Sequence, residues 1–231
     1  IDDSLVEAES SSLQGVIHES AKNISKVLGR SSKIYNNVIK GLSRHDLSEL
    51  KKNKKQISKL SSEVDNLKDK LFYFIKNLDE SSLGASNFYI NLLGYLQDIT
   101  QSIEYISKVS HKHINNNHSK LTLNQIRDLL DIQKIISEMF ENIASAFASK
   151  SFGDIKSILK DKNKMIGLLE DKIEAQISRT RTSEEKSPKN AALYFSILQE
   201  SKDLMREVMN LIEEYYVSYD KSVKPAKPKD E

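Results

Sequence analysis

Residues 92–98, Leu-Leu-Gly-Tyr-Leu-Gln-Asp, return about a hundred positions later as residues 194–200, Tyr-Phe-Ser-Ile-Leu-Gln-Glu. Each copy ends in a Leu-Gln-acid triplet and lies near the middle of a long pattern of apolar residues three or four positions apart. A fixed internal repeat defines the folding unit before its chemistry is considered. Here the unit is roughly 110 residues long, which is too long for a solenoid repeat and suits three long helices.

The register of the repeat holds on both sides of this stretch. We therefore expect Leu96 and Leu198 to be buried counterparts, each at the centre of its own half of the chain. Apolar residues of the first copy have apolar counterparts in the second: Tyr35 and Phe140, Val38 and Ile143, Leu42 and Phe147, Leu50 and Ile155, Ile103 and Met205, and Ile106 and Val208.

The composition indicates an all-α protein. Only seven Gly and three Pro occur in 231 residues, and alternating strand patterns bounded by turn residues are nearly absent. We predict an antiparallel bundle of six helices, made of two tandem three-helix repeats at residues 1–119 and 120–220. Residues 221–231, rich in Lys and Pro, are predicted to form a disordered tail.

The helix boundaries are predicted from caps and turns. Asp46 to Glu49 and Thr122 to Gln125 read as capping boxes, and Ser187-Pro188 as an N-cap followed by a first-turn proline. The first predicted helix runs from near Ser4 to near residue 43, and the second covers 46–78. The third runs from after the turn at 79–84 toward His113, and the fourth covers 122–150. The fifth runs from after the link at 151–154 to 179–182, and the sixth covers 187–219.

Charge and cysteine content exclude several classes of protein. The formal net charge is only +2, from 35 basic and 33 acidic residues, which argues against nucleic-acid binding. Cys is absent from the sequence, so disulfides and thiol chemistry are excluded. No apolar run approaches the ~20 residues that a membrane-spanning helix requires. Because the sequence begins with Ile1 rather than Met, we expect it to be a piece of a longer protein.

Enzymatic signatures are missing from the sequence. It contains no Gly-x-Ser-x-Gly motif, no Gly-rich phosphate loop and no Glu-x-x-His di-iron motif. We therefore predict a protein that is not an enzyme.

The order of these segments resembles a known family. Two tandem three-helix units, each with a Leu-Gln-acid motif in its third helix, are similar to PhoU-type proteins, and in particular to the PhoU-like C-terminal domain of PiT-family inorganic phosphate transporters of the Bacteroidota type. The resemblance extends from about residue 20 to 216. The order and spacing of its segments are more specific than any one motif. The segments that carry it are residues 33–42, 71–75, Tyr89 with 95–98, 113–118 and 193–204.

The resemblance implies a regulatory module that acts by protein contact on the cytoplasmic side of the inner membrane. Its partner would be the transmembrane permease portion of the same polypeptide, encoded upstream of Ile1, and self-association is left open. The alternative is a helical surface lipoprotein or adhesin that binds a host or partner protein, because such bundles share this Lys-, Asn- and Ser-rich composition.

The resemblance also bears on metal binding. PhoU-type proteins hold metal ions through acidic residues four apart on the third helix of each repeat, where such pairs share one face. The matching positions here are Gln97 and Gln101 in the first copy, and Gln199 and Asp203 in the second. Three of four carboxylates are amides, so we predict no metal site or cofactor and expect the glutamines to hydrogen-bond between helices or to water. The alternative is one divalent ion at the remaining acids, Asp98, Glu200, Asp203 and Glu207.

Three further groups of side chains are assigned structural or surface roles. His111, His113 and His118 are predicted to stabilise a helix end rather than bind metal. The aromatic residues Phe72, Tyr73, Phe74, Phe88 and Tyr89 are predicted to pack in the core where the second and third helices meet. Tyr215, Tyr216 and Tyr219 are interpreted as a surface that faces a partner.

Overall fold

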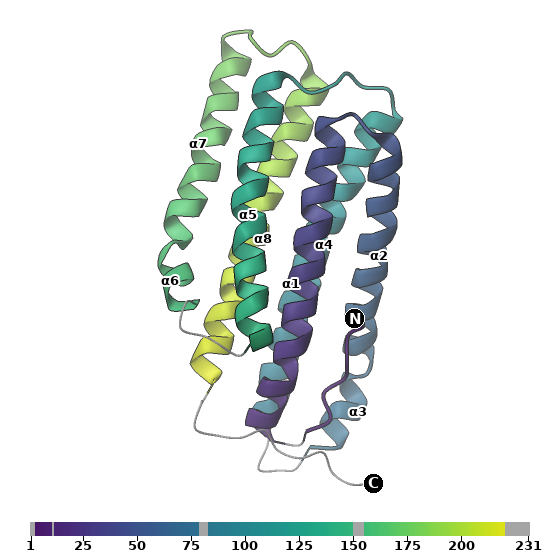
Figure 1. The fold of residues 1–231 in the computed structure, drawn as a ribbon, viewed down its shortest axis with the longest axis vertical. Coiled ribbons are helices and arrows are strands. Elements are labelled where there is room, and N and C mark those ends of the chain that lie inside the picture. Colours follow the sequence, from purple (N-terminus) through teal and green to yellow (C-terminus); the bar gives the residue numbers. More distant parts are fainter. Residues whose placement is uncertain (1–2, 11, 79–82, 150–154, 220–231) are drawn as a thin grey trace.

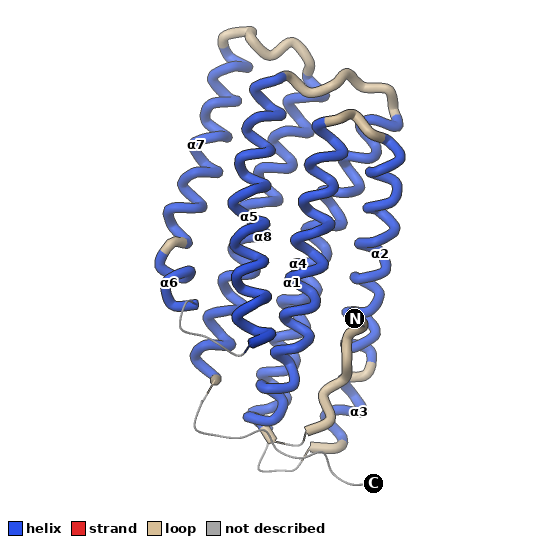
Figure 2. The backbone as a smooth tube through the Cα atoms, viewed as in Figure 1, coloured by secondary structure: helices blue, strands red, loops and turns tan. Residues whose placement is uncertain are grey.

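The computed structural model describes residues 3–10, 12–78, 83–149 and 155–219 (Figure 1). Within these ranges the chain forms helices joined by short links and contains no strand (Figure 2). The predicted all-α class is therefore confirmed. The helices are α1 (Leu13–Ser43), α2 (Leu47–Asp69), α3 (Leu71–Lys76), α4 (Leu83–Asn115), α5 (Leu123–Ser149), α6 (Ile155–Lys160), α7 (Lys162–Arg181) and α8 (Pro188–Ser218).

Three long helices begin at the caps that the sequence predicts. The Asp46 side chain accepts the backbone N–H of Glu49 at 3.0 Å. Thr122 and Gln125 form a reciprocal box, in which the Thr122 hydroxyl accepts the Gln125 N–H at 3.2 Å and the Gln125 side chain accepts the Thr122 N–H at 3.0 Å. The Ser187 side chain caps α8. These hydrogen bonds satisfy amides that a helix leaves unpaired at its start.

The first helix begins at Leu13, so the predicted start near Ser4 is wrong. Ser12 caps it, because its hydroxyl accepts the backbone N–H of Gly15 at 3.1 Å. Serine hydroxyls compete with helical hydrogen bonds, and the run of serines before Leu13 favours a cap over a longer helix. The preceding segment passes close to α1 at Gly15, where a Cβ atom would collide with the side chain of Ser10.

The second and fifth predicted helices are correctly placed but not continuous. The second is interrupted at Lys70, whose N–H bonds to the carbonyls of Leu67 and Lys68 and so closes α2 with a tight turn. The fifth is interrupted at Asp161, between α6 and α7.

The break at Lys70 explains why part of the aromatic prediction is wrong. Phe72 and Tyr73 are each 66% exposed, whereas Phe88 and Tyr89 are buried. Phe74 packs against Tyr89 with 4.4 Å between ring centroids. A six-residue helix such as α3 presents one side to the core, so the two residues before Phe74 project away from it.

The repeat corresponds to a shared pattern of burial. Leu96 and Leu198 are both 0% exposed, which confirms that these counterparts are buried. The remaining counterparts, none more than 2% exposed, are Tyr35, Val38, Leu42, Leu50, Ile103, Ile106, Phe140, Ile143, Phe147, Ile155, Met205 and Val208.

The helices of the two halves pack against each other along their lengths (Figure 1). α1 lies beside α5 and α4, α4 lies beside α8, α2 covers α4 and α1, and α7 lies along α8. One buried apolar cluster extends through both halves. The superposition of residues 4–118 on 122–219 stays a prediction. The predicted tail at 221–231, most of the turn at 79–84, and the link at 151–154 lie outside the described residues.

Candidate functional site

The four acidic residues of the sequence analysis gather where α4 and α8 meet. Asp98 lies on α4, and Glu200, Asp203 and Glu207 follow one another at helical spacing on α8. The buried Ser102 of α4 joins them, because its hydroxyl donates to Glu207 Oε2 at 3.0 Å. We call the surface formed by Asp98, Glu200, Asp203, Glu207 and Glu214 the acidic face.

Negative charge on the acidic face is only partly compensated. Burial raises the pKa of Glu207 to about 7. Repulsion from Asp98, Glu200 and Asp203 also raises this pKa, whereas the hydrogen bond from Ser102 lowers it. Burial also raises the pKa of Glu200, with repulsion from Asp203 in the same direction. Arg206 Nη1 lies 3.9 Å from Asp203 Oδ1 in a largely exposed pair. Such a pair contributes little, so the face retains excess negative charge.

The glutamines at the positions expected to hold metal are engaged elsewhere or exposed. Gln97 donates to Asp65 Oδ1 at 2.9 Å and accepts from Lys68 Nζ at 2.8 Å, both residues of α2. This confirms an inter-helix hydrogen-bonding role for Gln97. Gln101 and Gln199 are exposed to solvent.

The donor set does not fit a metal cluster. Among residues 3–10, 12–78, 83–149 and 155–219, no three or more His, Asp or Glu side chains are arranged to hold a metal ion. The Glu207 carboxyl, with its raised pKa and its hydrogen bond to Ser102, is a poor ligand because a metal would have to displace its proton.

We predict that the protein purifies without stoichiometric Fe, Zn or Mn and that its melting temperature does not change with a chelator. The reason is that Gln97, Gln101 and Gln199 carry neutral amides at three of the four positions where the resemblance implies carboxylate ligands. Elemental analysis of tag-free protein tests this. More than about one tightly held transition metal per chain near Asp98 or Asp203 would contradict it.

Glu207 also yields a prediction about pH. Its raised pKa means that the folded state binds more protons than the unfolded state between pH 4.5 and about 7, so ionisation costs stability as the pH rises through this window. At pH 8, Glu207→Gln should raise the free energy of unfolding by about 1 kcal/mol, after allowance for solvent screening, and the gain should shrink toward pH 5.

Urea denaturation at pH 5 and pH 8 measures this effect. Glu213→Gln is the matched control, because Glu213 is an exposed glutamate on the same helix. Equal changes for Glu207→Gln at both pH values would show that the carboxyl is not ionising against its surroundings.

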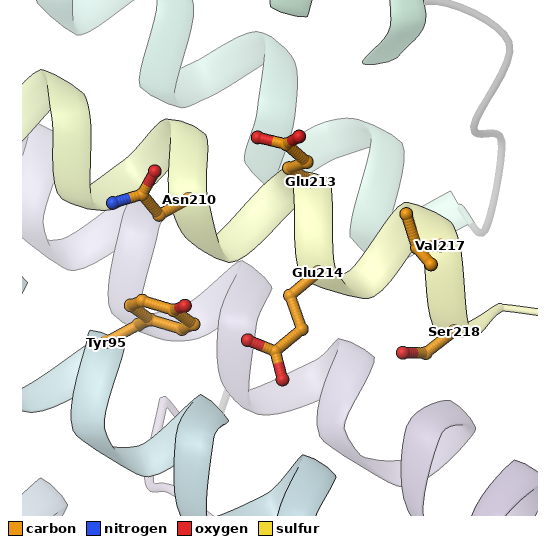
Figure 3. A pocket seen from close by; sticks show the side chains of 6 residues that line it. All are labelled: Tyr95, Asn210, Glu213, Glu214, Val217 and Ser218. Carbon is orange, nitrogen blue, oxygen red and sulfur yellow. The ribbon is translucent and has the colours of Figure 1, made fainter.

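A surface pocket of about 280 Å³ lies at the end of the acidic face (Figure 3). Asn91 Nδ2 of α4 donates to Glu214 Oε1 at 2.9 Å beside it. Burial raises the pKa of Tyr95, and the contact with Glu214 and the charge of Asp98 raise it further. Sequence analysis missed this pocket, although the seven-residue spacing of Glu200, Glu207 and Glu214 indicates a continuous acidic stripe. The lining residues are Tyr95, Asn210, Glu213, Glu214, Val217 and Ser218.

Of the three tyrosines near the end of α8, Tyr215 is not part of a partner-facing surface. Tyr215 is buried, and its hydroxyl donates to the carbonyl of Ile17 at 3.1 Å. Its ring lies edge-on to Phe147 at 4.6 Å and stacks on Tyr219 at 5.8 Å. The prediction is therefore wrong for Tyr215, since the helix turns this residue into the core. Tyr216 is 43% exposed.

The histidines lie at the end of α4 and beyond it. His113 is buried, its Nε2 lies 3.1 Å from the carbonyl oxygen of Ser119, and its ring centroid is 5.0 Å from that of His118. Burial lowers the pKa of His113, which favours the neutral ring. The contact between His113 and Ser119 therefore holds the link after α4 against the helix end, which agrees with a structural role for His113.

A second polar cluster, missed from the sequence, joins α5, α7 and α8. Tyr194 Oη donates to Asp128 Oδ2 at 2.7 Å, while Lys172 Nζ lies 3.1 Å from Asp128 Oδ1 and Arg179 Nη2 lies 3.3 Å from Oδ2. Burial opposes ionisation of Asp128, but the bonds from Tyr194, Lys172 and Arg179 outweigh it and lower the pKa. Lys172 and Arg179 share the Asp128 carboxylate, so we assign the cluster a structural role.

Two general findings bear on the function. Within the part of the chain that the structure describes, no helix is both long and apolar enough to cross a membrane. The sequence matches no model of a known protein family, and no curated protein matches it significantly.

Proposed function

We propose that this chain is a PhoU-like regulatory module of an inorganic phosphate transporter and acts by protein contact rather than catalysis. Its partner is the permease portion of the same polypeptide, and it works at the cytoplasmic side of the inner membrane. The acidic face carries the proposal, because it forms where the two Leu-Gln-acid segments of the repeat meet, on α4 and α8.

The chemistry of the acidic face favours a binding role. Its carboxylates accept hydrogen bonds from the side chains of Ser102 and Asn91, and they repel one another. A general acid or base needs a reacting group within hydrogen-bond reach, whereas an uncompensated row of carboxylates attracts and orients a basic segment. Long, rigid helices keep this row fixed, as a docking surface requires.

Reading the coding sequence upstream of Ile1 tests the proposal. Several membrane-spanning segments continuous with this chain are expected. A lipobox signal directly upstream would contradict the proposal and support the surface lipoprotein or adhesin.

A further inference from the structure

A row of lysines follows the outer side of α2. The buried residues Ile57 and Leu60 turn the other side of this helix toward the core. Lys51, Lys55 and Lys59 are four residues apart and exposed, so they share one side of the helix over about 12 Å of its axis. Within the described ranges, none of these three lysines forms a salt bridge.

The neighbouring helix α4 extends this positive surface. Burial lowers the pKa of His111 on α4, and the positive charges of Lys54 and Lys51 on α2 lower it further. The end of α4 therefore lies beside the lysine row. Lys108 and Lys112, close to His111 on α4, are also exposed. We call the surface formed by Lys51, Lys54, Lys55, Lys59, Lys108 and Lys112 the basic face.

The carboxylates closest in sequence to the basic face offset its charge only in part. Asp46 caps α2, and Glu63 pairs with Arg30 of α1 at 2.6 Å. Glu49 in the first turn of α2 and Glu104 on α4 are therefore set against six lysines. The basic face retains an excess of positive charge.

The acidic face does not cancel this excess for a surface that approaches from the side of α2. Both α2 and α8 pack against α4, and α2 lies at the edge of the bundle (Figure 1). Packed helices are about 8–10 Å apart, whereas charges are screened over about 8 Å at physiological ionic strength. A surface next to α2 therefore meets mainly positive charge, although the net charge of the chain is only +2.

The chemistry of the basic face favours a lipid bilayer over a nucleic acid. All six of its charges are lysine ammonium groups, which attract headgroup phosphates as point charges without a fixed geometry. The face has none of the arginine forks or stacking aromatic rings with which proteins hold nucleic acids. Because α2 is a straight, rigid helix, several lysines of the row can reach one plane at the same time.

We propose that the basic face docks on a bilayer that contains anionic lipids, with the axis of α2 along the membrane surface. The contact is peripheral, and it leaves the acidic face on α8 open to a protein partner. It does not rest on the proposed link to a transporter, because the charges of α2 and α4 alone carry it.

Sedimentation of the full chain with vesicles tests this contact. Vesicles of phosphatidylcholine are compared with vesicles of equal parts phosphatidylcholine and phosphatidylglycerol. We expect binding only where phosphatidylglycerol is present, and loss of binding in about 0.5 M NaCl, where the screening length falls to a few Å. Replacing Lys51, Lys55 and Lys59 with Gln should weaken binding by about tenfold or more, because each lysine near an anionic surface adds to the attraction.

Two further variants show whether position or charge alone decides the result. Replacing Lys156, Lys160 and Lys164 with Gln removes the same charge at the same spacing from exposed positions on α6 and α7. This control should bind like the wild type. Replacing the three lysines of α2 with Arg keeps their charge and should also preserve binding.

Three results would overturn the proposal. The first is a wild-type chain that does not bind the phosphatidylglycerol vesicles. The second is equal binding by the two Gln variants, which would assign any attraction to net charge or to another part of the chain. The third is tighter binding of the wild type to duplex DNA than to vesicles at the same phosphate concentration, which would assign the basic face to a nucleic acid.

Discussion

Replacing Leu96 or Leu198 with Ala is expected to lower the free energy of unfolding by about 2–5 kcal/mol, the range for fully buried leucines. Both side chains are completely buried in one continuous apolar cluster. Truncation removes buried methyl groups and leaves a cavity between packed helices, which cannot collapse freely. If the repeat describes two equivalent centres, the two losses should be similar.

Chemical denaturation of both variants measures the loss. Leu123→Ala is the matched control. Because Leu123 is 79% exposed at the start of α5, its replacement should change the free energy of unfolding little. A loss below about 0.5 kcal/mol at either buried site would remove the physical basis of the repeat.

Asp128→Ala is expected to lower the free energy of unfolding by about 2–3 kcal/mol at pH 7. The change leaves Lys172 and Arg179, both mostly buried, without their shared carboxylate, and leaves the Tyr194 hydroxyl without its acceptor. We place the loss below that of a fully buried ion pair because all three charged side chains keep some contact with solvent.

The pH dependence of this loss follows from the lowered pKa of Asp128. Stability from a carboxylate with a lowered pKa is present above its unfolded pKa and is lost as the pH falls through the folded value. The difference between wild type and Asp128→Ala should therefore be constant above about pH 5 and shrink below about pH 4.

Asp131→Ala provides the control in the same denaturation series. Asp131 lies on the same helix as Asp128, and its Oδ2 is 3.5 Å from Lys172 Nζ, but its side chain is 56% exposed. Equal losses for the two variants would show that the buried network has no special role.

The apolar pattern was sufficient to predict the all-α class and the buried positions, because burial depends on spacing along each helix. Leu96, Leu198 and their neighbours repeat every three or four residues, and caps such as Asp46 are local signals. The break at Lys70 was not predictable in this way, since a hydrophobic pattern continues through it. The exposed Phe72 and Tyr73 therefore look like core residues in the sequence.

The candidate site was only partly predictable. Asp98, Glu200, Asp203 and Glu207 were named from the sequence only as an alternative metal site near the repeated triplets, and the structure places them together where α4 and α8 meet. The role of Ser102 depends on the relative register of α4 and α8, which no local pattern encodes. The same applies to Asp128, whose partners are 44 to 66 residues away.

The most direct test of the regulatory account is the initial rate of phosphate uptake by the complete polypeptide reconstituted in vesicles. The wild type is compared with the triple variant Glu200→Gln, Glu207→Gln and Glu214→Gln, and with the control Glu138→Gln and Glu141→Gln on α5. We predict a several-fold change in uptake for the acidic-face variant and none for the control. Equal uptake by all three, with each variant folded, would contradict the account.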